Sequence, residues 1–402
     1  MGLLDQLPPL LPFKEGAFTS RLRSAQVTSK IGIALAACIA ICFLTGLWSH
    51  YQQHPLDWVT IPTAPVWGYR LSQGLHVATG IAAIPLLLLK LWSVYPRLFE
   101  WPPVKSAGHA LERMFIAVLV AAMIFQLATG LINISQWYPW TFPFTQTHFA
   151  ISFVILGALF IHLAVKAPQI VAALQERASE PSALEPSDPN PAESEPAESE
   201  PALAAAVSRR NFFIVAGASV GAVTITTVGQ TVTPLEPVAA FAPRVPTMSP
   251  QGMPINRTAV AAKITPNLVG NDYRLVVDGP TPLALTIDDL QAMPQIDVDL
   301  PIACVEGWSA NAQWRGIRLA NLLDRAGIPP ESAIQVVSLE TNGNYGTSVV
   351  AANFARDPLT VMAMRINDEE LSLDHGYPIR LVAPNRPGVL QTKWINRIEV
   401  IS

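Results

Sequence analysis

A cysteine that follows a short apolar run is the first residue whose surroundings suggest chemistry. Cys304 comes after Leu300-Pro-Ile-Ala303 and opens the segment Val305-Glu-Gly-Trp-Ser309, so we expect a strand end to present it at a turn. An isolated cysteine is most often a small buried apolar side chain. A thiolate is also a soft, strong donor for a metal ion, and the rest of the sequence has to decide between these two interpretations.

Histidines form the second group of residues that could bind a metal. Six of the seven lie in or beside long apolar runs, where an ionisable side chain is costly and is therefore a candidate for function. His148 and His162 are fourteen residues apart, which corresponds to almost four helical turns and about 21 Å along one helix face. This spacing suits one axial haem ligand near each membrane surface.

A haem held by two histidines needs a second ligand at the same depth. His76 begins an apolar run on the side of His148, and His109 begins another on the side of His162. We therefore expect His76 and His148 to bind an outer haem, and His109 and His162 to bind an inner haem. His50 is an alternative to His76, and an interfacial location without a ligand role is the alternative for His109.

Four apolar runs are long enough to cross a bilayer and would position these histidines. They cover about 31–49, 71–93, 110–133 and 148–166. The connections 50–69 and 134–147 contain no lysine or arginine but several tryptophans and prolines, whereas the other flanks are basic. Because basic flanks stay in the cytoplasm, we expect the amino terminus inside and these two connections outside.

An acidic, proline-rich stretch follows the fourth run. Residues 176–200 hold eight acids and one arginine, and they include the near-repeat Pro-Ala-Glu-Ser-Glu, so we expect a disordered spacer. Ser208-Arg-Arg-Asn-Phe-Phe213 then precedes an apolar run to about Val228, which predicts a fifth membrane helix that runs outward. This run resembles a twin-arginine translocation signal, which would export a folded domain, and an ordinary helix with basic flanks is the alternative.

Composition agrees with a membrane protein that carries a soluble part. Half of the residues are hydrophobic, only 14% are charged, and the mean hydropathy is +0.32. The sequence contains no CxxC, CxxCH, Walker A or GxGxxG pattern, so zinc ribbons, c-type haem and nucleotide-binding loops have no support. No basic patch indicates a nucleic-acid partner.

From about Phe241 onward, strand and helix patterns are mixed. We expect strands at 274–278, 334–339, 360–366 and 379–383, and helices at 287–293 and 318–327. This α+β pattern has no βαβ repetition and so argues against a nucleotide-binding sheet.

Several motifs in this part, in this order, resemble the molybdopterin-binding domain of the sulfite oxidase family over about 255–402. They are Cys304-Val-Glu-Gly-Trp-Ser309, Trp314-Arg-Gly316, Glu340-Thr341, His375-Gly-Tyr-Pro-Ile-Arg380 and Thr392-Lys-Trp394. The Cys-Val-Glu-x-Trp-Ser form is most similar to the catalytic subunit of bacterial methionine-sulfoxide reductases. An ordered set of motifs is more specific than any one of them.

The resemblance implies a role for particular residues. Cys304 would be the protein's ligand to molybdenum, and Arg380 and Lys393 would bind the phosphate tail of the pterin. The further cofactor contacts implied are Asn256, Thr341, His375, Gln391 and Thr392. Tyr345, in Tyr345-Gly-Thr-Ser348, is similar to a substrate-facing tyrosine of sulfite oxidases and is the second catalytic candidate.

The motif departs from sulfite oxidases directly after the cysteine. Those enzymes carry arginines there that bind sulfite, whereas this chain has Glu306, Gly307 and Trp308. A carboxylate at this place would repel a dianion. We therefore expect a neutral oxo-acceptor in preference to sulfite.

The helical half resembles the di-haem b-type cytochrome subunits of membrane oxidoreductases, such as those of formate dehydrogenase and hydrogenase, over about 30–166. Four spans with paired histidines at a fourteen-residue spacing carry this resemblance. Those subunits take an inner ligand from the first helix, and the first run here has no histidine at its inner end. The inner haem is therefore the less supported of the two.

The sequence thus predicts an all-α membrane bundle of four helices plus a fifth anchoring helix, followed by an α+β domain of the sulfite oxidase type. The expected parts are a cytoplasmic amino terminus (1–29), a cytochrome b-like domain (30–167), a linker (168–207), the fifth helix (208–232) and a molybdopterin-binding oxidoreductase domain (240–402).

We expect a multi-pass protein of a bacterial inner membrane whose molybdopterin domain is periplasmic. It would bind molybdopterin and b haem, two by preference and one at least, and pass electrons from quinol to a small or protein-borne oxo-acceptor. A sulfite-type dehydrogenase that reduces quinone, a haem-only electron carrier and a membrane-anchored binding module without catalysis are the alternatives.

Overall fold

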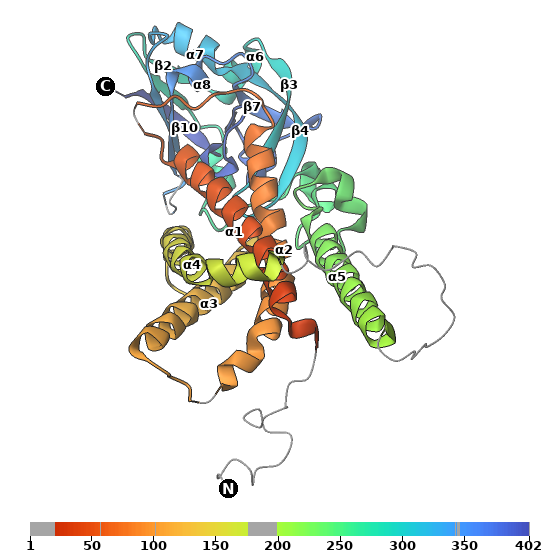
Figure 1. Cartoon of the computed structure of the whole chain (residues 1–402). Helices are drawn as coiled ribbons and strands as arrows, with labels where there is room; N and C mark the ends of the chain where they lie inside the picture. Colours follow the sequence, from red (N-terminus) through yellow and green to blue (C-terminus); the bar gives the residue numbers. More distant parts are fainter. Residues whose placement is uncertain are drawn as a thin grey trace, which may run out of the picture. The chain divides into compact units, whose positions relative to one another are not determined.

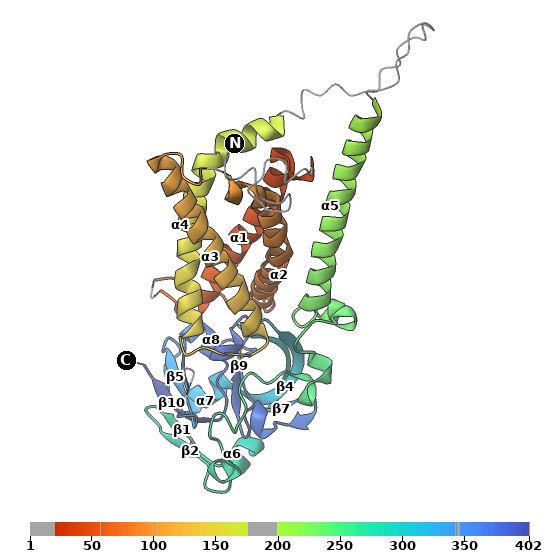
Figure 2. The ribbon, with the colours of Figure 1, turned by 90° about the horizontal axis from the view of Figure 1, so that it is seen from below.

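The structure is a computed structural model and describes residues 21–401 apart from 57, 101, 176–198, 342, 344 and 345. Its amino-terminal part is helical, and five of its helices are long and apolar enough to cross a membrane. Figures 1 and 2 follow the chain through these helices. They are α1 (Ala25–Gln53), α2 (Gly68–Val94), α3 (Ala107–Ile134), α4 (Phe144–Gln175) and α5 (Ser199–Val228).

The first four helices contain the predicted apolar runs and extend beyond both ends of each run. The predicted linker 168–207 stays a prediction; within its bounds α4 continues to Gln175 and α5 begins at Ser199. Apolar residues continue to Leu174, and the alanine-rich stretch 202–206 favours helix. The predicted disorder of 176–198 lies outside the described residues. The fifth helix ends at Val228, before the predicted 232.

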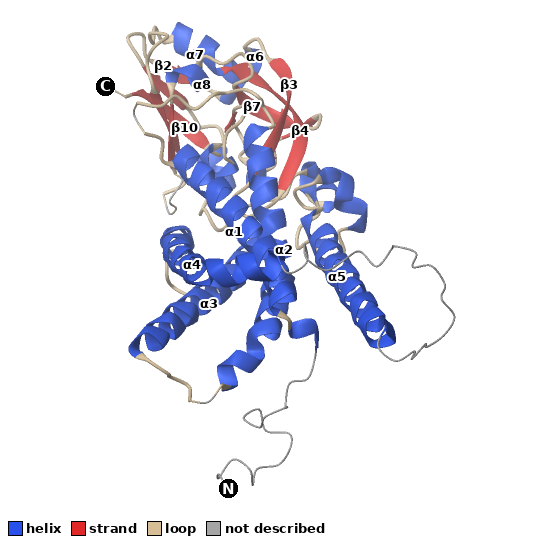
Figure 3. Ribbon diagram, viewed as in Figure 1, coloured by secondary structure: helices blue, strands red, loops and turns tan. Residues whose placement is uncertain are grey.

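The carboxyl-terminal part contains two five-stranded sheets (Figure 3). The first has the order β2-β1-β10-β5-β6, and only its β1–β10 pair is parallel. The second has the order β3-β4-β7-β8, with β9 also paired to β7. The strands are β1 (Leu275–Asp278), β2 (Leu283–Leu285), β3 (Ile296–Ala303), β4 (Ser309–Arg318), β5 (Ile334–Ser338), β6 (Thr347–Val350), β7 (Val361–Ile366), β8 (Glu369–Glu370), β9 (Arg380–Val382) and β10 (Ile395–Val400).

Short helices complete this α+β domain. They are α6 (Ile287–Ala292), α7 (Leu319–Arg325) and α8 (Ala352–Ala355), with 3₁₀ turns that include η9 (Leu373–His375) and η10 (Gly388–Leu390). The largest core cluster takes residues from both sheets and from all three helices, among them Leu275, Leu319, Ile334, Phe354 and Met362. Burying each such large side chain stabilises the fold by about 1.5–3 kcal/mol. A second cluster, which includes Met253, Ile302, Cys304 and Trp308, surrounds the pocket described below.

The chain divides into two compact units that do not follow the predicted domain boundary. One unit comprises 44–78, 133–137 and 225–402, and the other comprises 1–43, 79–132 and 138–224. The unit with the sheets therefore includes the connection between α1 and α2 and the end of α3.

The connection after α1 is part of the sheet domain's core. Ile61 belongs to the largest core cluster, and Asn353 Nδ2 donates to the Ile61 carbonyl oxygen at 2.8 Å. Asn385 Nδ2 donates to the Pro62 carbonyl oxygen at 2.7 Å, and Tyr69 N–H donates to Asn385 Oδ1 at 2.6 Å. The Ile61 side chain and the carbonyl groups of Ile61 and Pro62 thus have partners in the sheet domain.

Candidate active site

Cys304 lies in the turn of the β3–β4 hairpin. The two strands pair from Ile296–Gly316 to Ala303–Ser309. The turn is closed by Cys304 N–H, which donates to the Trp308 carbonyl oxygen at 2.9 Å, and by Gly307 N–H, which donates to the Cys304 carbonyl oxygen at 3.0 Å. Gly307 has φ +82°, a left-handed conformation that favours glycine. This tight turn holds Cys304 at the end of β3, as the sequence predicted.

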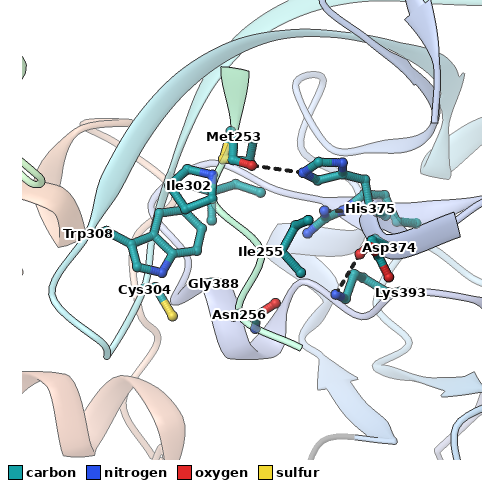
Figure 4. A pocket seen from close by; sticks show the side chains of 12 residues that line it. Met253, Ile255, Asn256, Ile302, Cys304, Trp308, Asp374, His375, Gly388 and Lys393 are labelled. Atoms are coloured by element: carbon teal, nitrogen blue, oxygen red, sulfur yellow. Dashed lines mark hydrogen bonds between the residues drawn. The ribbon is translucent and has the colours of Figure 1, made fainter. Parts of the chain in front are cut away.

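A pocket of about 290 Å³, open solvent at its mouth included, lies beside this turn. In Figure 4, Cys304 and Trp308 lie on one side of the pocket, and His375 and Lys393 lie on the other. The lining residues are Met253, Pro254, Ile255, Asn256, Ile302, Cys304, Trp308, Asp374, His375, Arg380, Gly388 and Lys393. The pocket thus gathers five of the predicted site residues from segments far apart in the sequence.

The Cys304 side chain is fully buried. Burial raises the pKa of its thiol well above the ordinary value, and the nearby Glu306 carboxylate raises it further. The thiol is therefore protonated at neutral pH in the protein alone. Binding a metal would release this proton, because the thiolate is the form that ligates.

His375 is held by protein groups at both ring nitrogens. Nε2 faces the Met253 carbonyl oxygen at 2.9 Å, and Nδ1 faces Ser372 Oγ at 2.9 Å. A carbonyl oxygen only accepts, so Nε2 carries the hydrogen and Nδ1 accepts one from Ser372. Burial lowers the pKa of His375 to about 4, so the ring is neutral. His375 reaches the pocket as predicted, and it also holds the wall at Met253.

Arg380 is a buried cation whose partners are neutral. Its Nη1 donates to the His375 carbonyl oxygen at 3.0 Å, and its Nη2 donates to the Gln391 carbonyl oxygen at 3.3 Å. The guanidinium also lies over the Trp314 ring, 5.1 Å from its centroid. Nε is buried and has no hydrogen-bond partner among the described residues. Burial lowers the pKa of Arg380 to about 9.

Lys393 is the second buried cation. Nζ donates to the Arg257 carbonyl oxygen at 2.5 Å and to the Asp374 carbonyl oxygen at 2.9 Å. Burial, followed by repulsion from Arg380, lowers the pKa of Lys393 to about 7. In the described part of the chain neither cation forms an ion pair with a carboxylate. Two uncompensated cations in one wall favour an anionic ligand such as a phosphate.

The remaining predicted contacts differ in their locations. Asn256 lines the pocket. Gln391 and Thr392 are buried behind it, where Gln391 Nε2 donates to the Arg386 carbonyl oxygen at 3.0 Å and Thr392 Oγ1 bonds to Ser348 Oγ at 2.7 Å. Thr341 is exposed and is not among the lining residues. Tyr345, the second catalytic candidate, lies outside the described residues.

Residues that the sequence did not single out as site residues also shape the pocket. The Met253 carbonyl oxygen and Ser372 orient His375. Arg386, only 6% exposed, donates to the carbonyl oxygens of Leu390 (3.1 Å) and Val349 (2.6 Å), and so supports the η10 turn beside the pocket. The Asn385-Arg-Pro-Gly388 turn gave no sign that Arg386 is buried, because arginines in turns are mostly exposed.

Glu306, expected to repel an anion, is held beside the Cys304 turn. Trp308 Nε1 donates to Glu306 Oε2 at 3.1 Å, and Arg244 Nη1 lies 3.9 Å from the same oxygen. Burial raises the pKa of Glu306. The site thus has its cationic wall at Arg380 and Lys393 and a carboxyl group near Cys304.

The predicted outer haem ligands belong to different units. His76 lies in the unit with the sheets, and its Nδ1 lies 3.2 Å from Thr45 Oγ1. His148 lies in the other unit, where a methyl group added at Gly130 would lie 3.6 Å from its ring. The pairing of His76 with His148 stays a prediction.

The predicted inner ligands lie in one unit. His162 is half-buried. His109 Nδ1 accepts a hydrogen bond from the Lys105 N–H at 3.1 Å, which places the ring hydrogen on Nε2. Glu112, one turn beyond His109, forms an ion pair with Lys166 at 2.5 Å. His109 would have to break its bond to Lys105 and change tautomer to ligate through Nε2, so the inner site stays a prediction.

Comparison with known proteins finds similarity to a known family of domains. Residues 262–402 match the oxidoreductase molybdopterin binding domain. The chain is 35% identical over 156 residues to the mitochondrial sulfite oxidase of Drosophila melanogaster, covering 32% of this chain and 27% of that one. It is 29% identical over 168 residues to the NADH nitrate reductase of Volvox carteri, covering 34% and 19%.

A third relative carries a different name. The chain is 31% identical over 130 residues to a protein of Azospira oryzae named as a protein-methionine-sulfoxide reductase subunit, covering 32% of this chain and 48% of that one. The chain therefore spans less than half the length of each of these curated relatives.

Proposed function

We propose a function from the premise that residues 262–402 form a molybdopterin-binding oxidoreductase domain, as their motifs predicted. The chain would be a membrane-bound molybdenum enzyme that moves electrons between the quinone pool and an extracytoplasmic substrate through b haems. One observation carries the proposal. The Cys304 thiol lines the same pocket as two buried cations that have no carboxylate partner.

The donor set fits molybdopterin. Cys304 would supply the single protein thiolate to molybdenum, and Arg380 and Lys393 would bind the phosphate end of the pterin. The unpartnered Nε of Arg380 is a donor that such an anion could use. When bound, the molybdenum group supplies two-electron oxygen-atom exchange with a substrate. The fixed turn of Cys304 and the neutral His375 would orient that group.

The placement of the outer connections supports electron delivery from the membrane. The connections 50–69 and 134–147 lack lysine and arginine, which is typical of non-cytoplasmic loops. Residues 44–78 and 133–137 form one compact unit with the pocket. We therefore place the molybdopterin domain on the periplasmic side, where His76 and His148 would hold the outer haem. Export through the twin-arginine motif at Arg209 and Arg210 would let the domain receive its cofactor before it crosses the membrane.

Charge near Cys304 favours a reductase with a neutral substrate. Glu306, Gly307 and Trp308 occupy the place of the arginines that bind sulfite in sulfite oxidases, and Glu306 is held by Trp308 and Arg244. A carboxylate there would weaken the binding of an anion. We therefore propose a sulfoxide or N-oxide, small or protein-borne, as the oxygen donor. The name of the Azospira relative agrees with this class.

The relatives support one alternative. Sulfite oxidase of Drosophila is more than a third identical over its aligned part. In a sulfite-type dehydrogenase the same residues would serve electron transfer in the reverse direction, from substrate to quinone.

Metal and optical analysis of the detergent-purified chain tests the proposal. We expect molybdenum in the protein, a b-haem spectrum that quinol reduces, and reoxidation of that haem by sulfoxides or N-oxides. Haem reduction by sulfite would support the dehydrogenase instead. Protein with haem but no molybdenum, or unchanged reoxidation in Cys304→Ser, would contradict a molybdenum enzyme and leave a haem-only carrier or a binding module.

A further inference from the structure

The Cys304 turn is held from outside the sheet domain by the end of α3. Asn133, only 7% exposed, donates from Nδ2 to the Val305 carbonyl oxygen at 3.2 Å. Both residues lie in the same compact unit. A carbonyl group in a tight turn that protrudes from its sheet needs such a partner, because the strand ladder no longer reaches it.

Two other helix ends contact the same turn. A methyl group added at Gly307 would lie 3.0 Å from Val77 Cγ2 of α2 and 2.9 Å from Ile134 Cγ2 of α3, so the turn packs closely against both. Ser309 N–H donates to the carbonyl oxygen of Gln230, two residues beyond α5, at 2.8 Å. The turn is therefore enclosed by the ends of α2, α3 and α5.

The end of α3 also holds the opposite wall of the pocket. Gln136 Nε2 donates to the carbonyl oxygen of Asn256, a lining residue, at 3.1 Å. Asn133 and Gln136 thus bond to both segments that approach Cys304. Neither residue lines the pocket itself.

The contact with α2 joins the turn to a predicted haem ligand. His76 is bonded to Val77, and Val77 packs on Gly307, which lies three residues from Cys304. The packing of the Val77 side chain on Gly307 thus connects the segment of His76 with that of the candidate molybdenum ligand.

We propose that electrons pass between the outer haem and the pocket through the turn 304–308. Asn133 and Gln136 would position this turn for electron transfer. This inference rests on the proposed function. Electrons would leave the His76 haem one at a time and pass through Val77 and Gly307 toward Cys304. Oxidation of one quinol releases two electrons and two protons, and reduction of one sulfoxide or N-oxide consumes two of each and forms water.

The positioning role of Asn133 and Gln136 is tested first in cofactor-free protein. Asn133→Leu keeps the size of the side chain but removes the donor, and Gln146→Leu makes a similar change at an exposed outer position. Losing one hydrogen bond of about 1 kcal/mol should raise amide hydrogen exchange at Val305–Ser309 roughly fivefold. Exchange that matches the wild type in Asn133→Leu and in Gln136→Leu would overturn the positioning role.

Electron transfer through the turn is tested in the enzyme with its cofactors bound, by the ratio of quinol-driven to viologen-driven activity. Quinol supplies electrons through the haem, whereas a reduced viologen supplies them to the pocket directly. In Asn133→Leu and Gln136→Leu we expect the quinol-to-viologen ratio and the rate of haem reoxidation by substrate to fall, with Gln146→Leu unchanged. Equal losses of both activities would mean that the two residues only support the pocket. A wild-type haem that substrate does not reoxidise would instead contradict the proposed function.

Discussion

At residue scale, Cys304 differs from serine by its sulfur atom, which makes the thiol a stronger acid and a softer metal donor than a hydroxyl. The side chain is fully buried, so serine would fit with little change in volume. A hydroxyl is a harder donor and loses its proton less readily, so Cys304→Ser should lose molybdenum-dependent turnover while the protein stays folded. Metal analysis and the melting curve of the cofactor-free variant check this. Turnover near the wild-type level would exclude Cys304 as the ligand.

Lys393 makes the stability of the cofactor-free protein depend on pH. Burial lowers its pKa from 10.5 to about 7, so between these values the unfolded chain binds more protons than the folded one. Stability should therefore rise as the pH increases from 7 to 10, by at most about 1.4 kcal/mol per pH unit from this group. Melting midpoints at pH 7, 8 and 9, compared with Lys393→Met, measure the effect.

A bound phosphate group would favour the protonated form of Lys393 and so raise its pKa. Cofactor affinity should fall as the pH rises above 7, because the anion then has to bind with uptake of a proton. Lys393→Met should flatten both pH dependences. A wild-type melting midpoint that falls from pH 7 to 9 would contradict the assigned environment of this lysine.

At element scale, the connection between α1 and α2 is part of the sheet domain. Ile61→Ala removes a side chain that is 9% exposed from the largest core cluster. We expect the free energy of unfolding of the sheet domain to fall by roughly 2–3 kcal/mol. Ile401→Ala, the same change at a position that is 39% exposed, is the matched control. Equal melting midpoints for the two variants would show that Ile61 is not a core residue.

The β3–β4 hairpin illustrates how an element sets chemistry. Its ladder ends at Ala303 and Ser309, and the five residues between them form a turn held by two backbone hydrogen bonds. A one-residue shift of this register would turn Cys304 away from the pocket, because alternate residues of a strand face opposite sides. The hairpin therefore decides which side chain reaches the metal site.

At the scale of the whole molecule, the proposed circuit depends on haem ligands in the membrane helices. His148→Ala should remove the outer haem and abolish quinol-driven reduction of the substrate, because one histidine does not hold a six-coordinate b haem. The reduced-minus-oxidised spectrum and the haem content per chain measure the loss. His54→Ala, at an exposed position in the outer connection, is the control. A spectrum unchanged by His148→Ala would exclude this ligand.

The sequence alone determined the long apolar helical runs, the α+β class of the carboxyl-terminal part, and the position of Cys304 at a strand end. These features are local, because hydrophobic length, residue periodicity and a glycine turn act over a few residues. The ordered motifs also predicted that His375, Arg380 and Lys393 would share one site with Cys304, and the pocket brings them together.

Only the tertiary structure decided which groups surround those residues. Asn385 bonds to Tyr69 across 316 positions, and Asn133 bonds to Val305 across 172. No local pattern marks such pairs, because each depends on where separate elements pack and on which buried backbone groups still need partners. The same reason explains why the outer connection joins the core of the sheet domain, and why Arg380 and Lys393 bond to carbonyl oxygens and leave their charge for a ligand.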